Sequence, residues 1–222
     1  MKFIAKKAVL QTAVIVIAVV VLNSCIGASA DISIRADGSG RIALEYRISK
    51  ALESLGRQDG SERRPIIPAG KEDFERGLAR VSGLTLRSFS SKEVRSTNDG
   101  RDILIKAVLD FTDPGALLSF LDITGSHASL VQNNTEPANL LRLVLLEPSA
   151  DVLNADLVSL LREVYAGYEI RISLSVPKSA SLEVSPPSAA ARTVSGGKKV
   201  SFAIEIGELL TLTEGLVLEI NW

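Results

Sequence analysis

Short segments in which apolar and polar residues alternate run through the chain after Asp31, and this pattern constrains the fold more than any other feature. In residues 168–176 every second residue is apolar, and the residues between them are Glu, Arg or Ser. Successive side chains of a β-strand point to opposite faces of a sheet, so this spacing predicts a strand with one buried and one wet face. Charged residues make up 23% of the chain and hydrophobic residues 46%, which excludes a disordered tail and a protein with several membrane spans.

The first part of this region has the pattern of a β-hairpin. Ile32 and Ile34 share one face, residues 37–40 (Asp-Gly-Ser-Gly) can turn the chain, and apolar residues alternate again over 42–48. These four residues lack the spacing of a phosphate-binding loop and lead into a strand instead of a helix, so we interpret them as a turn. Further strands are predicted at 84–94, 101–111, 127–132, 140–146, 181–185, 199–206 and 216–222.

Three segments have the spacing or the capping residues of helices. Residues 71–81 and 154–165 place apolar residues at helical intervals. A third helix is predicted from Asp113, because Asp can cap free N–H groups and the Pro that follows suits the first helical position. Together the segments predict an α+β fold, with a mainly antiparallel, curved β-sheet and about three helices packed on one side. Residues 113–125 mark a weak subdomain break.

The N-terminal segment differs from the rest of the chain. Three lysines occur within the first seven residues, an apolar segment covers 8–22, and no acidic residue precedes Asp31. A basic start, an apolar core and an exit of small residues are the three parts of a secretory signal peptide. The uninterrupted apolar run over 13–22 is shorter than the about 20 residues that span a bilayer, although the whole segment could make a tilted span. A retained N-terminal anchor helix is therefore the alternative.

The only cysteine of the chain, Cys25, directly follows this segment, in the order Leu22, Asn23, Ser24, Cys25. This order resembles the lipobox of bacterial lipoproteins, in the relaxed form that spirochaetes tolerate, because Asn23 departs from the usual Ala, Ser, Thr or Val. The resemblance implies recognition of Leu22, Asn23 and Ser24 by the lipoprotein signal peptidase, cleavage before Cys25, and a diacylglyceryl group on its sulfur. It divides the chain into a lipoprotein signal peptide (1–24), a lipidated N-terminus with a short tether (25–30) and an exported α+β domain (31–222).

Cleavage would leave a mildly acidic protein, because residues 1–24 hold three of the 25 basic residues and none of the 26 acidic ones. Such a charge attracts neither nucleic acid nor anionic headgroups broadly, so we expect no nucleic-acid partner. We expect the domain to hang from its lipid with its surface free, because two or three acyl chains hold a protein almost permanently. Ile26 stands where Asp favours inner-membrane retention in enteric bacteria. This favours the outer membrane or the periplasmic face of the cell envelope.

Candidate catalytic residues are few. The only imidazole, His127, has Ser126 as its neighbour, but adjacent residues of a strand point to opposite faces, so we expect no Ser–His pair there. Paired carboxylates such as Glu72 and Asp73 stand at a helix start, where negative charge is favourable without a catalytic role. With one Cys and one His in the chain, we expect no catalytic residue, no cofactor and no metal site.

We expect a lipid-anchored envelope lipoprotein with a non-catalytic binding or scaffolding domain. The length, the opening hairpin, the β-rich plan and the lipobox are similar to those of the mycobacterial LppM-like lipoproteins, and this resemblance implies a link to lipid binding. A module that binds or carries a lipid or another hydrophobic ligand is the alternative, and an envelope enzyme of unknown class is the second alternative. The expected partners are the membrane, through the N-terminal lipid anchor, and an envelope protein or a lipid ligand.

Overall fold

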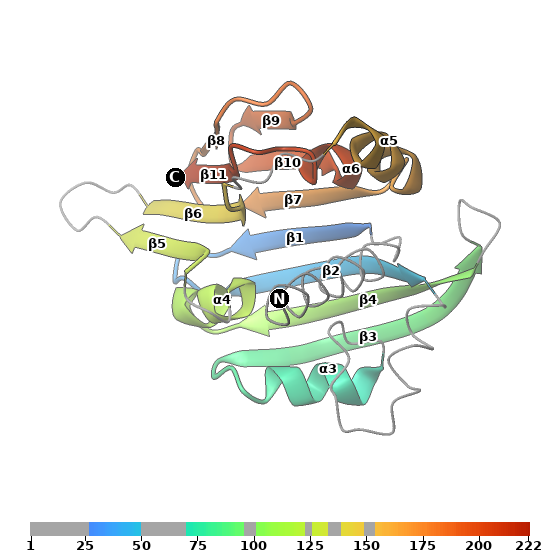
Figure 1. The fold of residues 1–222 in the computed structure, drawn as a ribbon. Coiled ribbons are helices and arrows are strands. Elements are labelled where there is room, and N and C mark those ends of the chain that lie inside the picture. The colour runs from blue at the N-terminus through green and yellow to red at the C-terminus, as the bar shows by residue number, and fades with distance from the viewer. Residues whose placement is uncertain (1–26, 50–69, 96–100, 123–125, 133–138, 149–153) are drawn as a thin grey trace, which may run out of the picture.

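The computed structural model describes residues 27–49, 70–95, 101–122, 126–132, 139–148 and 154–222, which form eleven strands and four helices (Figure 1). The strands are β1 (Ala28–Ile34), β2 (Gly40–Ser49), β3 (Leu84–Arg95), β4 (Arg101–Phe111), β5 (Ala128–Gln132), β6 (Asn139–Leu146), β7 (Glu169–Ser175), β8 (Ser181–Ser185), β9 (Arg192–Gly196), β10 (Lys199–Glu205) and β11 (Leu216–Asn221). The helices are α3 (Lys71–Leu78), α4 (Pro114–Leu121), α5 (Ala155–Val164) and α6 (Ile206–Leu209).

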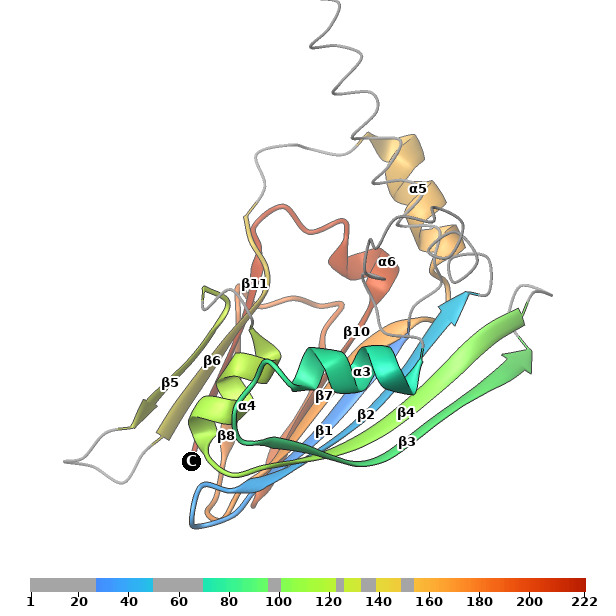
Figure 2. The ribbon, with the colours of Figure 1, turned by 90° about the horizontal axis from the view of Figure 1, so that it is seen from below.

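The strands form two sheets, whereas the sequence pattern predicts one. The larger sheet has the order β3-β4-β2-β1-β7-β10-β9, and the smaller sheet has the order β5-β6-β11-β8. Neighbouring strands are antiparallel except β1 and β7, which are parallel. Figure 2 shows the smaller sheet at an angle to the larger one, with α3 and α4 on the same side of the larger sheet. The predicted α+β class is confirmed, with two sheets and a fourth helix as corrections.

The two sheets share one buried apolar cluster. It contains Ile32, Leu109 and Phe202 from the larger sheet and Leu141 and Leu218 from the smaller one. These residues occupy the apolar positions of the alternating segments, so the predicted buried faces meet in the space between the sheets. Removal of this apolar surface from water is the main force that holds the sheets together. The opposite face of the larger sheet carries mostly charged residues and serines.

Strands that follow each other in the sequence often belong to different sheets. The sequence pattern does not show these changes, and it therefore predicts a single sheet. Helix α4 lies between β4 and β5, α5 lies between β6 and β7, and α6 lies between β10 and β11. Each of these helices joins a strand of one sheet to a strand of the other. The alternation within a strand shows that one face is buried, but it does not show which second layer covers that face.

The predicted hairpin and its turn are confirmed. β1 and β2 are antiparallel neighbours, and residues 37–40 lie in the connection between them. The carboxylate of Asp37 accepts hydrogen bonds from the backbone N–H of Ser39 at 3.0 Å and from its hydroxyl at 2.8 Å. Gly38 has φ 83°, in the left-handed region that glycine adopts without steric cost. The Gly-rich segment is therefore a turn between two strands.

Two predicted helix starts are confirmed by their caps. The side chain of Asp113 accepts a hydrogen bond from the backbone N–H of Ala116 at 3.0 Å, and Asn154 accepts one from Leu157 at 2.8 Å. Hydrogen bonds from the hydroxyl of Thr112 and from the N–H of Ala116 hold the pKa of Asp113 below its usual value. Both caps stabilise helices that connect the two sheets.

Other boundaries differ from the prediction for local reasons. Helix α3 ends at Leu78 instead of residue 81, and α6 occupies positions that the sequence pattern assigns to a break between strands. The sequence does not predict β9, because its residues RTVSG are mostly polar and all five are exposed at the sheet edge. β1 begins at Ala28, inside the segment 25–30 that the sequence assigns to the tether. Its small residues pair on both sides, with β2 and with β7.

Candidate functional site

The four residues of the predicted lipobox, Leu22, Asn23, Ser24 and Cys25, lie outside the described residues. The described fold starts at Gly27, and β1 starts one residue later, at Ala28. Because consecutive Cα atoms are about 3.8 Å apart, at most about 11 Å separates the Cα atoms of Cys25 and Ala28. The covalent chain therefore limits how far the predicted lipidation site can be from the start of β1. In the described ranges, no helix has the length and apolar character needed to cross a membrane.

A groove lies on the polar face of the larger sheet at the end where β1 begins. The floor is β1 and the residue before it, where Gly27 and Ser29 carry little or no side chain. The longer side chains of the two neighbouring strands form the walls, with Glu45 and Arg47 on β2 and Glu169 and Arg171 on β7. The cavity has a volume of about 240 Å³. We call it the β1 groove.

The carboxylates of the β1 groove are paired, but one of its cations is not. Glu169 forms ion pairs with both Arg171 and Arg192, and Glu45 forms one with a lysine of β4. Arg47 is half-buried as a residue, and its guanidinium has no ion pair or hydrogen bond to any side chain in the described part of the chain. A guanidinium in a groove that lacks a side-chain partner favours an anionic ligand, above all a carboxylate or a phosphate.

Tyr168 fixes the same end of the sheet. Its hydroxyl donates a hydrogen bond to the carboxylate of Asp102 at 3.3 Å, and the two residues are 3% and 1% exposed. Its ring carbon Cδ1 would lie 3.5 Å from a Cβ added at Gly27. This buried contact ties the start of β7 to the start of β4 across the two strands between them. This hydrogen bond therefore fixes the strands that carry the walls of the β1 groove relative to each other.

A larger cavity lies at the opposite end of β1. It has a volume of about 490 Å³, and its apolar lining includes Ile34, Leu130 and Trp222. The exposed residues Arg35, Lys178 and Asp37 also line it, so its charged lining consists of two cations and one carboxylate. Because the cations outnumber the carboxylate, this cavity can bind an anionic amphiphile, with the hydrocarbon part on the apolar wall and the acidic group at the cations. We call this cavity the far cleft.

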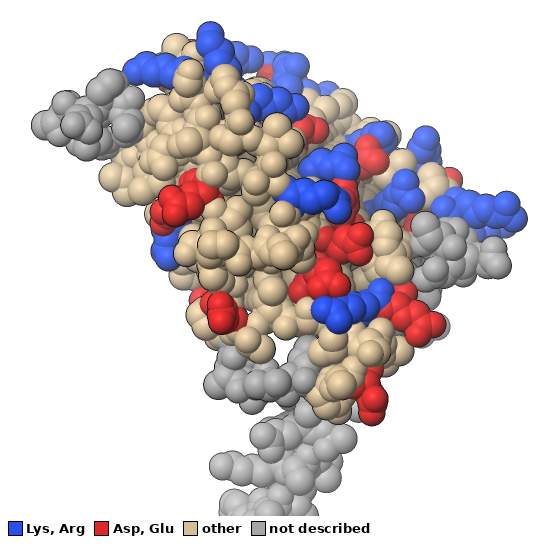
Figure 3. Space-filling view, turned by 90° about the horizontal axis from the view of Figure 1, so that it is seen from above, with Lys and Arg blue, Asp and Glu red and all other residues tan. Residues whose placement is uncertain are grey.

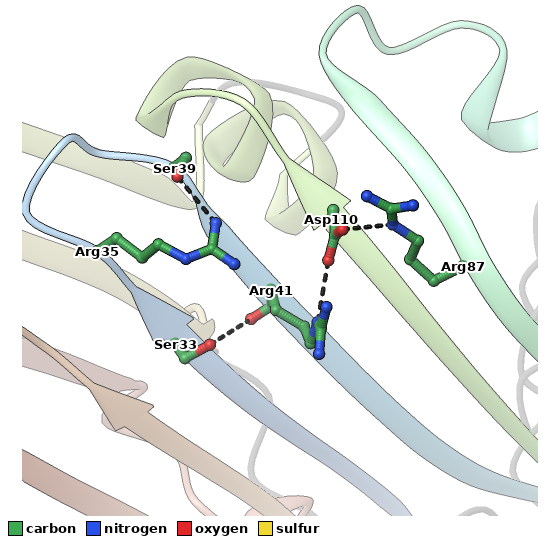
Figure 4. A network of polar contacts seen from close by, with 6 residues as sticks. All are labelled: Ser33, Arg35, Ser39, Arg41, Arg87 and Asp110. Atoms are coloured by element: carbon green, nitrogen blue, oxygen red, sulfur yellow. Dashed lines mark hydrogen bonds and ion pairs between the residues drawn. The ribbon is translucent and has the colours of Figure 1, made fainter.

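A polar network covers the charged face of the larger sheet near the far cleft (Figure 4). Arg41 Nε donates to Asp110 Oδ1 at 3.0 Å, and Arg87 Nε donates to the other carboxylate oxygen. Hydrogen bonds from Arg87 and Arg41 hold the pKa of Asp110 below its usual value. The carboxylate is thus shared by two arginines from two different strands, and its contacts join β2, β4 and β3.

The structure brings His127 together with a hydroxyl and a carboxylate. Ser126 Oγ lies 2.9 Å from His127 Nδ1, and His127 Nε2 lies 3.3 Å from an oxygen of Glu147. The prediction that Ser126 and His127 point to opposite faces was wrong, because β5 begins at Ala128 and both residues precede the strand. The buried carboxylate of Asp122 holds this bend by accepting hydrogen bonds from the backbone N–H groups of His127 and Ala128.

A hydroxyl beside an imidazole that also contacts a carboxylate is the arrangement by which a serine nucleophile is activated. In this chain the side chain of Glu147 is 70% exposed and that of His127 is 41% exposed. Neither the β1 groove nor the far cleft is lined by these residues. The cluster therefore has the polar groups of a serine site, and it lies apart from both of these cavities.

The remaining charged candidates lie on exposed surfaces. Glu72 is exposed in the first turn of α3, where the helix dipole favours negative charge. Figure 3 shows basic and acidic side chains intermixed over the face formed by β9, β10, α5 and α6, and Arg162 with Glu208 is one ion pair of this region, at 2.8 Å. Within the described ranges, no group of three or more His, Cys, Asp or Glu is placed to hold a metal ion.

Comparisons with known proteins do not assign the chain to a family. No protein-family model and no curated protein matches it. Among solved structures, it is similar to the folded domain of Mycobacterium tuberculosis LppM, with 11% identity, coverage of 88% of both chains and a TM-score of 0.37. It is also similar to a "putative protease" from Parabacteroides distasonis, with 11% identity, coverage of 90% of this chain and 40% of that chain, and a TM-score of 0.35. Likenesses this weak carry no functional argument.

Proposed function

We propose that the protein is a lipid-anchored lipoprotein of the bacterial cell envelope, whose folded domain binds a ligand or scaffolds a partner without catalysing a reaction. The observation that carries this proposal is the position of Cys25, which follows a basic start and an apolar segment in the order Leu22, Asn23, Ser24, Cys25. The described strands and helices all lie after residue 27, so cleavage before Cys25 would remove none of them. A signal peptide must be removable in this way, whereas the residue that takes the lipid must remain attached to the fold.

The proposal is tested by acylation and membrane attachment in a bacterial host that processes lipoproteins. The full chain and its Cys25→Ser variant are expressed with radiolabelled palmitate, and washed membranes are analysed for label and for chain length. We expect the wild type to be labelled and shortened by the signal peptide, and Cys25→Ser to be unlabelled and uncleaved. Ser24→Ala, which keeps a small residue before the cysteine, is the matched control and should behave as the wild type does.

The retained-anchor alternative gives a different result in the same experiment. The wild type and Cys25→Ser would then have the same full length, neither would carry label, and both would stay in the membrane through the apolar segment. That outcome would overturn the lipoprotein proposal.

The far cleft supports a second candidate function, binding of an anionic lipid or another anionic amphiphile. The observation that favours it is the apolar lining of Ile34, Leu130 and Trp222 next to Arg35 and Lys178. Trp222 is the only tryptophan of the chain, so its fluorescence reports directly on this cleft. Titration with dodecyl phosphate should change that fluorescence in a saturable way below the micelle concentration. The uncharged dodecyl maltoside is the control, and an equal response to both detergents would argue against a site that recognises the anionic group.

A further inference from the structure

We propose that the β1 groove binds the phosphate group of an anionic phospholipid and thereby holds this end of the domain against the bilayer. The inference rests on the proposed lipid anchor at Cys25. In this arrangement the domain does not hang freely but has a fixed end that faces the membrane. Arg47 is the residue that contacts the phosphate.

The covalent reach between the predicted anchor and the sheet is short. The acyl chains of a lipidated Cys25 enter the hydrocarbon layer, so its backbone lies among the headgroups. The headgroup region is about 5–8 Å thick on each side of the bilayer, and at most about 11 Å of chain separates Cys25 from Ala28. β1 is paired with β2 on one side and with β7 on the other from its first residue. The start of β1 therefore cannot move away from the membrane unless the whole sheet moves with it.

The shape of the β1 groove suits a small polar group. Gly27 and Ser29 on the middle strand are much smaller than the charged side chains that flank them on β2 and β7. The polar face is therefore hollowed at the end of the sheet that lies nearest to the predicted anchor. Figure 1 shows the start of β1, the end of β2 and the start of β7 together at this end. A headgroup phosphate can enter a polar groove of about 240 Å³ without displacing the apolar core.

The local charge of the β1 groove favours an anion. Glu169 is already shared by two arginines and Glu45 is paired with Lys106, whereas the guanidinium of Arg47 has no partner on the described residues. Arginine presents two parallel N–H donors to a phosphate, which is a stronger contact than a point charge makes. The exported part as a whole is acidic, so general attraction to anionic lipid does not explain such binding. Contact with a phosphate must therefore depend on this groove.

The test uses the acylated, processed protein in vesicles, with its acyl mass verified first. Ala166→Cys places a fluorescent label on an exposed turn beside Gly167, which lines the β1 groove, and Ala36→Cys places it at the far cleft. Because Cys25 is the only natural cysteine and its sulfur is acylated, each variant has a single free thiol. Nitroxide-labelled headgroups should quench the label at 166 strongly and the label at 36 weakly, since β1 alone is about 23 Å long.

Arg47→Gln then tests the groove itself. We expect this variant to bind water-soluble dihexanoyl phosphatidylglycerol about fivefold more weakly than the parent, because one arginine near a membrane surface contributes about that factor. Arg41→Gln is the matched control, since Arg41 lies on the same face of β2 but at the other end of the strand, and its affinity should equal that of the parent.

Each outcome has a defined meaning. Equal quenching of the two labels, or equal affinity of Arg47→Gln and the parent, overturns the groove proposal and leaves the anchor intact. Binding of inorganic phosphate as tight as binding of the phospholipid shows a site for free phosphate and also overturns it. A protein without acyl mass fails before this test begins, and that result overturns the proposed function instead.

Discussion

The two ends of β1 carry cavities of different origin. The β1 groove lies on one face of one sheet, and its shape follows from small residues on a middle strand between long residues on its neighbours. The far cleft lies where the two sheets approach each other, and its lining comes from the β1–β2 turn, from α4 and from strands of the smaller sheet. The groove is therefore set by strand register, whereas the far cleft is set by the packing of the two layers.

The two ends can therefore have separate roles, membrane contact at the β1 groove and ligand binding at the far cleft. If the proposed anchor holds the groove end at the membrane, the far cleft faces away from the bilayer, about one strand length from it. A ligand in the far cleft would then be bound at a distance from the membrane surface, and the phosphate contact in the groove would set the direction of the cleft.

The largest expected effect is a loss of stability when a glycine near the far cleft is replaced by alanine. A Cβ at Gly40, near the far cleft, would lie 2.0 Å from the carbonyl oxygen of Ser33 and 2.2 Å from the ring of Phe111. Gly40→Ala should therefore lower the free energy of unfolding by about 3 kcal/mol, the upper end of the range for overpacked cores. Urea unfolding measures this change.

Gly27→Ala is the matched control at the groove end. The nearest atom to an added Cβ is 3.5 Å away, which is an ordinary contact. The free energy of unfolding should stay within about 1 kcal/mol of the parent value. Similar losses for Gly27→Ala and Gly40→Ala would contradict the close approach of Phe111 to β2.

A second prediction concerns the cations of the far cleft. Replacing Arg35 and Lys178 together by Gln should weaken binding of dodecyl phosphate up to about thirtyfold, because each exposed charge contact contributes at most about 1 kcal/mol. Trp222 fluorescence measures the affinity. Arg47→Gln should leave it unchanged, and a loss of dodecyl phosphate binding in that variant would show that the two cavities are not independent.

The buried faces were predictable from the sequence, and their partners were not. The alternation over residues 168–176 predicts β7 correctly, because period-two spacing is a property of the strand itself. The parallel pairing of β7 with β1 is not predictable in this way, since it joins residues about 140 positions apart. The two-sheet arrangement is missed for the same reason.

The candidate sites show the same limit. The position of Cys25 after an apolar segment is a local pattern, so the sequence alone carries the lipidation hypothesis. Whether Arg47 has a side-chain partner among the described residues depends on which side chains face it from β1 and β4, and no local pattern contains that information. The contact between Ser126 and His127 was missed because the start of β5 was predicted one residue too early.

A third prediction concerns the pH dependence of the network at the far end. The pKa of Asp110 is lowered in the folded state by Arg87 and Arg41, so the ionised carboxylate stabilises the fold above the unfolded-state pKa of about 3.9. This contribution is lost as the pH falls through the lower, folded-state pKa. Asp110→Asn should therefore reduce stability at neutral pH by less than Gly40→Ala does. The difference from the parent should shrink in urea unfolding at acidic pH, and a difference that grows instead would contradict the shared carboxylate.

The smallest expected effect is at His127. The side chain is 41% exposed and lines neither cavity, so His127→Gln should change the free energy of unfolding by no more than about 0.5 kcal/mol. Palmitate labelling and dodecyl phosphate binding should also be unchanged. A hydrolytic activity of the wild type that His127→Gln abolishes would contradict a non-catalytic domain.

The central claim is that acyl chains on Cys25 hold this domain to the membrane. The most direct test is the intact mass of the native protein extracted from bacterial membranes. We expect a chain that begins at Cys25 and carries the added mass of a diacylglyceryl group. A chain that begins at Met1 with an unmodified thiol would contradict it.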